Sequence, residues 1–367
     1  MPNYSELLKP ELLSQPVYQP GKPIEYVARE LGLDPQTIVK LASNENPLGA
    51  SPKAVEAGKV ALQSVNLYPD GGCYDLKRAL AKSLDLDPEQ FIVGNGSNEV
   101  LELLGHAFIG KGDEVVMGEA AFIVYKLVTL LFGGVPVEVP TRDRRHDLKA
   151  MVDAVTDKTK LVFLASPDNP SGSANTKEEI MTLIDSLPES VVFVLDEAYS
   201  EYLDDPIDMK PVMANGKKVF CTRTFSKIYG LAGLRVGYGY GDAELVGLLN
   251  RAREPFNVSS VAQAAAIAAL EDRSFVAKCR EENAGERARL QEEFKSLGLE
   301  YIESAANFVT VNAGDGVAAF ESMQADGLVV RPLAPYGMPE WIRVTLGTPE
   351  ENRRALSSLN SFLSRQG

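Results

Sequence analysis

A lysine flanked by hydroxyl residues follows one of the apolar segments of the chain. The segment KVFCTRTFSK ends at Lys227, and the glycine-rich stretch GLAGLR ends at Arg235. A lysine that is partly removed from water has a lowered pKa and can form a Schiff base with a carbonyl compound. Donors that suit a phosphate group stand around it, namely Thr224, Ser226 and Arg235. Taken alone, Lys227 is better explained as an exposed loop lysine.

A carboxylate ends a second apolar segment. Asp196 follows VVFVL, and Tyr199 comes three residues later. A carboxylate in apolar surroundings is poorly solvated and needs a cationic partner. A ring nitrogen of a bound cofactor would serve, and a buried ion pair or a metal-binding acid remains an open alternative.

Two predicted turns join the Lys227 and Asp196 motifs as candidate site features. GNGSNE (residues 94–99) opens a predicted helix, and the backbone N–H groups at such a helix start bind anions. Asn169-Pro170-Ser171-Gly172 suits a turn after KLVFLASPD. Each turn alone is explained by an ordinary loop. All four features follow predicted strands, at the edge where open α/β sheets bind ligands, so together they indicate one site.

Nearly continuous apolar runs alternate with amphipathic helices along the middle of the chain. This alternation predicts a parallel sheet whose two faces are covered by helices. The expected strands lie at residues 91–97, 113–118, 135–140, 160–167, 191–200, 218–227 and 235–241, with helices at 98–108 and 122–131.

The pattern changes near Pro255. Residues 261–294 read as one helical region, and the short strands expected at 301–302, 307–312, 327–332 and 341–347 indicate an α+β layer. We therefore predict a large domain at residues 45–254. A small domain would combine residues 1–44 and 255–367, with an irregular N-terminal arm up to about Pro23.

The composition is that of a globular protein: 367 residues, 45% hydrophobic and 24% charged. The 37 basic and 51 acidic residues give a net charge of −14, which argues against nucleic acid and anionic membranes as partners. Three scattered cysteines and two histidines predict no disulfide framework and no metal site. Neither a signal peptide nor a membrane span is expected, which favours a cytoplasmic protein.

The order of these motifs resembles the fold-type I family of pyridoxal-phosphate enzymes, and more closely its histidinol-phosphate aminotransferase-like branch. The segments PGKPIEYVARELGL, KLASNENPLG, LYPDG, FSKIYGLAGLRVGY and GMPEWIRVTLGTPEENRR carry the resemblance over nearly the whole chain. It implies an α/β fold in which helices enclose a mixed, mostly parallel sheet, with a smaller α+β domain attached.

The resemblance also implies roles around the cofactor. Lys227 would attach pyridoxal 5′-phosphate and then move a proton between the substrate Cα and the cofactor C4′. Asp196 would face the pyridine nitrogen and keep it protonated. Tyr199 and Asn169 would hydrogen-bond the 3′ oxygen. The phosphate would be held by Ser97, Asn98, Thr224, Ser226 and Arg235.

Two aromatic residues have implied roles as well. Phe122 occupies the position of a ring-stacking aromatic, although a core residue of its helix is as good an explanation. Tyr68, in LYPDG, matches a tyrosine that relatives donate across a dimer interface to the neighbour's phosphate. The resemblance therefore implies a homodimer.

The substrate end is implied to contain Arg343, which would grip the substrate's anionic tail. A guanidinium suits a carboxylate and a phosphate equally, so Arg343 does not decide the substrate. Arg331 and Tyr18 match further positions of the histidinol-phosphate branch, with ordinary surface packing as the alternative. Asn44 would line the same pocket.

The chain departs from its relatives at two places. Asp168 stands where the family commonly has asparagine, and the segment Glu119-Ala120-Ala121-Phe122 has alanine where relatives often carry a larger residue. We expect an aminotransferase that exchanges an amino group between histidinol phosphate and 2-oxoglutarate or glutamate. The alternatives are an aromatic amino-acid aminotransferase, a decarboxylase on the same scaffold, and a non-catalytic sensor domain. The intact set of Lys227, Asp196, Tyr199 and Arg235 argues against the sensor.

Overall fold

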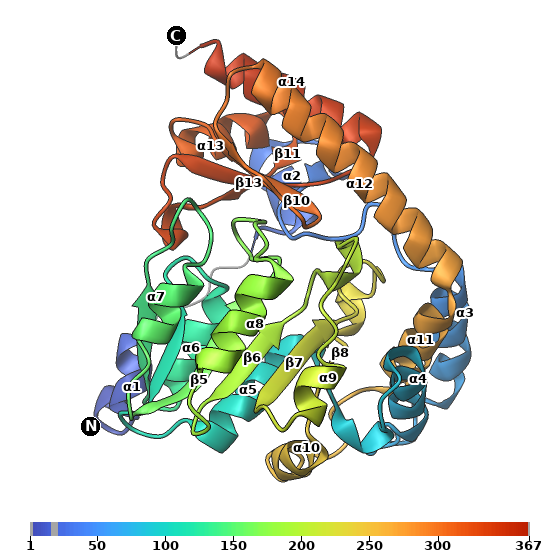
Figure 1. Ribbon diagram of the computed structural model, residues 1–367. Coiled ribbons are helices and arrows are strands. Elements are labelled where there is room, and N and C mark those ends of the chain that lie inside the picture. The colour runs from blue at the N-terminus through green and yellow to red at the C-terminus, as the bar shows by residue number, and fades with distance from the viewer. Residues whose placement is uncertain (1–2, 16–20, 366–367) are drawn as a thin grey trace.

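The computed structural model describes residues 3–15 and 21–365. A seven-stranded sheet forms its centre (Figure 1). Among these strands β8 runs antiparallel to both neighbours and the others are mutually parallel, which confirms the predicted mixed, mostly parallel sheet. The strand order is β2 (Phe91–Gly94), β8 (Gly237–Gly241), β7 (Val219–Thr224), β6 (Val192–Asp196), β5 (Thr159–Ala165), β3 (Glu114–Gly118) and β4 (Val135–Val139).

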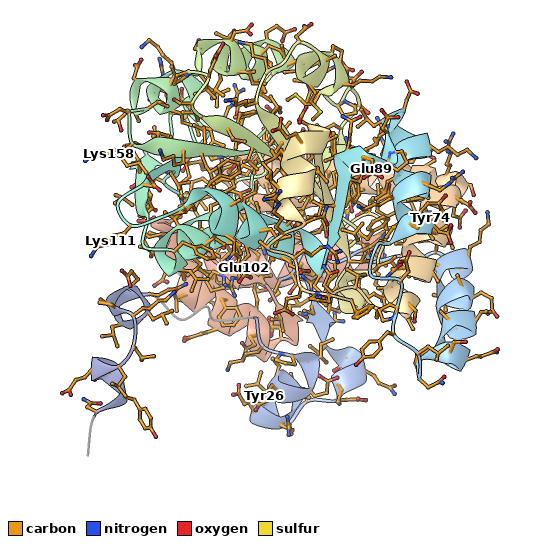
Figure 2. All side chains as sticks on the ribbon, turned by 90° about the horizontal axis from the view of Figure 1, so that it is seen from below. Tyr26, Tyr74, Glu89, Glu102, Lys111 and Lys158 are labelled. Carbon is orange, nitrogen blue, oxygen red and sulfur yellow. The ribbon has the colours of Figure 1, made fainter. Side chains whose placement is uncertain are left out.

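Helices cover both faces of this sheet, because its central strands are apolar on both sides. One face packs against α5 (Gly96–Phe108), α6 (Ile123–Leu131) and α10 (Ala243–Leu249). The other face packs against α4 (Tyr74–Leu84), α7 (Leu148–Asp153), α8 (Lys177–Ser186) and α9 (Lys210–Ala214). Charged side chains are left at the periphery, as Lys111 and Lys158 show in Figure 2. Glu89 and Glu102 are exposed as well.

A second layer holds the C-terminal part of the chain. Its four-stranded antiparallel sheet has the order β12 (Arg331–Pro332), β13 (Trp341–Thr345), β10 (Phe308–Asn312) and β9 (Tyr301–Ile302). A parallel pair, β1 (Val39–Lys40) with β11 (Leu328–Val329), brings in the N-terminal region. Its helices are α2 (Ile24–Leu31), α12 (Arg273–Ser296), α13 (Gly316–Ala325) and α14 (Pro349–Leu363). Figure 1 shows α12 running alongside α14 and reaching down to the large sheet's layer.

Short 3₁₀ turns connect several of these elements. They lie at Tyr4–Glu6, Pro35–Thr37, Leu62–Ser64, Pro88–Gln90, Ser200–Tyr202, Ala232–Leu234 and Ala334–Tyr336.

Two predicted segments differ in the structure. The N-terminal segment is not wholly irregular, because α1 (Pro10–Ser14) starts at a proline, which suits the first helical position. The helical region expected at 261–294 is divided into α11 (Ser260–Glu271) and α12. The break falls at Asp272, whose carboxylate accepts hydrogen bonds from Ser51 and Ser274 at 2.5 and 2.9 Å.

Helix α11 packs on α3 (Pro52–Ala61) and α4, and its alanines share the core beneath the large sheet. The division of the chain at residue 255 stays a prediction, and this packing favours a junction near the start of α12. Within residues 3–15 and 21–365, no helix is both long and apolar enough to cross a membrane.

Candidate active site

A cavity of about 220 Å³ lies where β5, β6 and β7 end and face the small sheet. Most of the predicted site residues line it: Asn44, Ser97, Asn98, Phe122, Asn169, Asp196, Tyr199, Thr224, Ser226, Lys227, Arg235, Arg331 and Arg343. A larger groove of about 750 Å³ between α7 and α8 contains none of them. The convergence of polar groups, rather than volume, therefore marks the candidate site.

Lys227 lies three residues beyond the end of β7. Its Nζ donates a hydrogen bond to the backbone oxygen of Ser43 at 3.1 Å and lies 5.7 Å from the centre of the Tyr199 ring. Burial, assisted by the charge of Arg343, lowers the pKa of Lys227 to about 7. Near neutral pH a substantial fraction of this lysine is therefore the uncharged, nucleophilic amine.

Asp196 ends β6 and is 3% exposed. The Tyr125 hydroxyl donates to its Oδ2 at 2.7 Å, and the Ala198 N–H donates to its Oδ1 at 3.1 Å. Burial raises the pKa of Asp196, and the Tyr125 hydrogen bond acts in the opposite direction. Among the described residues no basic side chain forms an ion pair with this carboxylate. A protonated ring nitrogen would supply the missing positive charge.

Tyr199 presents its hydroxyl beside Asp196. The hydroxyl oxygen accepts a hydrogen bond from Asn44 Nδ2 at 2.9 Å, and burial raises the pKa of Tyr199 to about 12. The hydroxyl thus keeps its proton and can donate it to a ligand. Asn44 is held in turn by the Thr345 hydroxyl, which donates to Asn44 Oδ1 at 3.0 Å.

Arg343 connects the small sheet to the cavity. It stands on β13, is 6% exposed, and donates from Nη2 to the backbone oxygen of Ala42 at 2.7 Å. Its Nη1 donates to Asn169 Oδ1. Because the amide oxygen is engaged, the amide nitrogen is the atom that Asn169 can offer to a ligand.

The other end of the cavity fits an anion. Arg235 Nη1 donates to Ser226 Oγ at 3.2 Å, and the Ser226 N–H donates to Thr224 Oγ1 at 3.1 Å. Ser97 belongs to the first turn of α5, where backbone donors face a ligand. Glycine at position 96 allows this approach, because a Cβ there would lie 2.5 Å from Arg235 Nη2. Its φ of 75° also suits glycine.

The remaining predicted residues have different positions. Phe122 precedes α6, lines the cavity and also packs against the core, so both explanations of its role fit. Arg331 lines the cavity from β12. Tyr68 does not line it: the side chain is 82% exposed and stacks on Phe256 with ring centres 4.8 Å apart. Tyr18 lies outside the described residues.

Several lining residues were not predicted as site residues. They are Gly21, Ala42, Ser43, Tyr125, Ala165, Pro167, Ala198 and Tyr336. Ser43 contacts Lys227 through its backbone oxygen, which no side-chain pattern can indicate. Tyr125 lies three residues after Phe122 in the helix predicted at 122–131, and this spacing was the available signal.

Comparisons with known proteins agree with this geometry. Residues 36–359 match the family model "Aminotransferase class I and II". A histidinol-phosphate aminotransferase of Akkermansia muciniphila is 47% identical over 347 residues, covering 94% of this chain and 96% of the relative. Histidinol-phosphate aminotransferase 1 of Cupriavidus pinatubonensis is 45% identical, covering 99% and 96%.

A solved structure shows the same similarity in three dimensions. Histidinol-phosphate aminotransferase from Sinorhizobium meliloti, in complex with pyridoxal-5′-phosphate, superposes with a TM-score of 0.88 at 30% identity and 98% coverage of both chains. Together with the matches in sequence, this places the chain in the class I and II aminotransferase family, among the histidinol-phosphate aminotransferases.

Proposed function

We propose that this chain is a pyridoxal-phosphate-dependent aminotransferase whose substrates are histidinol phosphate and 2-oxoglutarate. One observation carries the proposal: a neutralisable lysine, a buried carboxylate that no described basic side chain pairs with, and the start of a helix surround a single cavity. These are the groups needed for an aldehyde, a ring nitrogen and a phosphate. When bound, pyridoxal phosphate supplies an electron-withdrawing ring that accepts an amino group from one substrate and gives it to the next.

The residues of this chain would have distinct roles at the cofactor. Lys227 would hold the cofactor through its amine and would carry a proton on Nζ to and from the substrate Cα. Asp196 would face the ring nitrogen, while Tyr199 and Asn169 would donate to the 3′ oxygen. The phosphate would be held by Ser97, Asn98, Thr224, Ser226 and Arg235, and Phe122 would contact the ring.

The substrate end supports a phosphate tail. Arg343 and Arg331 both line the cavity from the small sheet, with Asn44 between this end and Tyr199. Two guanidinium groups suit a dianionic phosphate better than a carboxylate. An aromatic amino acid also combines a flat ring with an anionic tail, and Arg343 alone would bind its carboxylate, so this substrate is the one to test against.

The proposed active unit is a cytoplasmic homodimer. Tyr68 and Phe256 belong to a group of exposed apolar side chains that also includes Leu62, Val65 and Leu67. Such a surface favours covering by another protein chain. In the dimer Tyr68 would reach the cofactor phosphate of the partner. Sedimentation of the purified protein as a monomer at micromolar concentration would contradict this assembly.

Half-reactions test the substrate directly. The holoprotein is mixed with histidinol phosphate, glutamate or phenylalanine, and the visible absorption of the cofactor is followed. We expect phenylalanine to react at least about ten-fold more slowly than histidinol phosphate. A faster reaction with phenylalanine would show an aromatic aminotransferase instead. Arg331→Ala should slow histidinol phosphate more than glutamate, and equal slowing would contradict a role at the phosphate tail.

A further inference from the structure

A hairpin turn follows β4. The Arg142 N–H donates to the Arg145 oxygen and the Arg145 N–H donates to the Arg142 oxygen, both at 2.9 Å. Asp143 and Arg144 have φ values of 50° and 60°. Two consecutive left-handed residues are what a tight two-residue hairpin requires. His146 follows this turn directly and enters the protein interior, where it is 6% exposed.

The hairpin holds the loop that carries Asn169. This loop, residues 166–175, joins β5 to α8. Three hydrogen bonds connect the two segments: Arg145 Nη2 to the Ala174 oxygen at 3.0 Å, Ser173 Oγ to the Arg144 oxygen at 3.3 Å, and Asn175 Nδ2 to the His146 oxygen at 3.2 Å. The end of the loop that follows Asn169 is therefore fixed by the hairpin.

A buried contact between an imidazole and a carboxylate holds the residue just before Asn169. His146 Nε2 lies 3.1 Å from Asp168 Oδ1, and the two side chains are 2% and 5% exposed. The other carboxylate oxygen accepts hydrogen bonds from the Ser171 hydroxyl at 2.7 Å and the Ser171 N–H at 3.2 Å. A carboxylate buried to this degree requires polar partners, and among the described residues His146 is the basic side chain in contact with it.

Other charged groups around the pair are engaged elsewhere. Arg144 lies over the Trp341 ring at 4.9 Å, and Arg145 pairs with Glu179 of α8 at 2.8 Å. Asp147 caps α7. Glu119 lines a small cavity of about 90 Å³ together with Arg144 and Asp168. Burial raises the pKa of the Tyr125 phenol on α6, and Asp168 contributes to this rise. The imidazole fits because position 118 is glycine, where a Cβ would lie 2.2 Å from His146 Nδ1.

We propose that His146 and Asp168 form a positioning pair for transamination. The pair fixes the loop so that Asn169 accepts from Arg343 and turns its amide nitrogen toward the 3′ oxygen of the cofactor. This inference rests on the proposed function for the role of Asn169.

Four variants test the proposal: His146→Gln, Asp168→Asn, the double variant, and His106→Gln. The last is the matched control, because His106 is an exposed histidine on α5, 4.0 Å from Glu102. Three quantities are measured. They are the pH midpoint of the absorption change of bound pyridoxal phosphate, the urea midpoint of the cofactor-free chain, and kcat with KM.

We expect His146→Gln to raise the absorption midpoint by about half a pH unit or more, because a displaced Asn169 no longer stabilises the anionic 3′ oxygen. Its kcat should fall about ten-fold, as expected for a misplaced contact to the reacting group. The double variant should recover most of the loss in midpoint, stability and kcat, since it removes the unpaired charge. His106→Gln should match the wild type.

An absorption midpoint that is unchanged in His146→Gln would overturn the proposal, as would a double variant as impaired as the single one. If His146→Gln fails to fold, the double variant decides, because the proposal requires it to fold and bind the cofactor. The absorption measurement uses pyridoxal phosphate without substrate. A chain that binds the cofactor and ignores histidinol phosphate would therefore refute the proposed substrate and leave the test of the pair intact.

Discussion

Asp196 and Asp168 lie close together at the same edge of the large sheet and are each 3% exposed. Asp196 ends β6 opposite Ala165, and Asp168 stands three residues past that alanine. Their partners differ: Asp196 has a phenol and a backbone N–H, whereas Asp168 has an imidazole. Two equally buried carboxylates thus have chemically different partners. Asp196, which pairs with no basic side chain among the described residues, faces the cavity and can bind a cationic ring, while Asp168, in contact with the imidazole, holds a loop.

The largest expected difference between the two carboxylates is in their effect on kcat. Asp196→Asn should lower kcat by about 10²–10³-fold, because a preorganised charge at the reacting ring is lost. Asp168→Asn should lower it no more than about three-fold, because an amide of the same size still fills the position and the loop retains its other hydrogen bonds. Steady-state kinetics on both proteins decide. Comparable losses would show that the two carboxylates do not differ in role.

The pH dependence of the rate of cofactor uptake tests the cavity that Asp196 and Lys227 share, and not the loop held by Asp168. The pKa of Lys227 is about 7 and only the neutral amine attacks an aldehyde. Stopped-flow uptake of pyridoxal phosphate by the cofactor-free chain should rise about ten-fold from pH 6 to pH 8 and then level off. A rate that keeps rising to pH 10 would mean that Lys227 is not shifted.

The lowered pKa of Lys227 also affects the free energy of unfolding. Between pH 7 and the usual pKa of lysine, the unfolded chain binds more protons at this side chain than the folded chain does. The contribution of Lys227 to the free energy of unfolding of the cofactor-free chain therefore increases with pH in that window. Lys227→Met should remove this increase, whereas a surface substitution such as Lys158→Met should leave it in place.

A smaller effect than that of Asp196→Asn concerns the hydrogen bond that Asp196 receives. Tyr125→Phe removes it and should weaken cofactor binding about five-fold, equivalent to about 1 kcal/mol. Equilibrium dialysis with pyridoxal phosphate measures this. Tyr202→Phe offers a control, because Tyr202 is also buried but does not line the cavity. Equal weakening in both variants would assign the effect to general packing.

Much of the candidate site follows from sequence because its residues end apolar strands. Parallel strands in one sheet bring Asn169, Asp196 and Lys227 to one edge whatever the details of the loops. The partner of Asp168 could not be found in this way. His146 follows a hairpin whose left-handed residues are aspartate and arginine, so the usual Asn-Gly signal for such a turn is missing.

The domain boundary shows a second kind of difficulty. The change of composition near Pro255 indicates a change of structure, but the alanine-rich α11 that follows packs closely on α3 and α4. Small side chains permit this approach, and helical periodicity alone does not say which layer such a helix joins. The role of Tyr68 stays a prediction, because its proposed contact lies in another copy of the chain.

The attachment point of the cofactor tests the central claim most directly. The holoprotein is treated with borohydride, which fixes pyridoxal phosphate to the amine that holds it, and the digested chain is mapped by mass spectrometry. The geometry predicts the label on Lys227, and no stable label when Lys227→Ala is treated in the same way. A label on another lysine of the wild-type protein, or none at all, would contradict the assignment of this cavity as the active site.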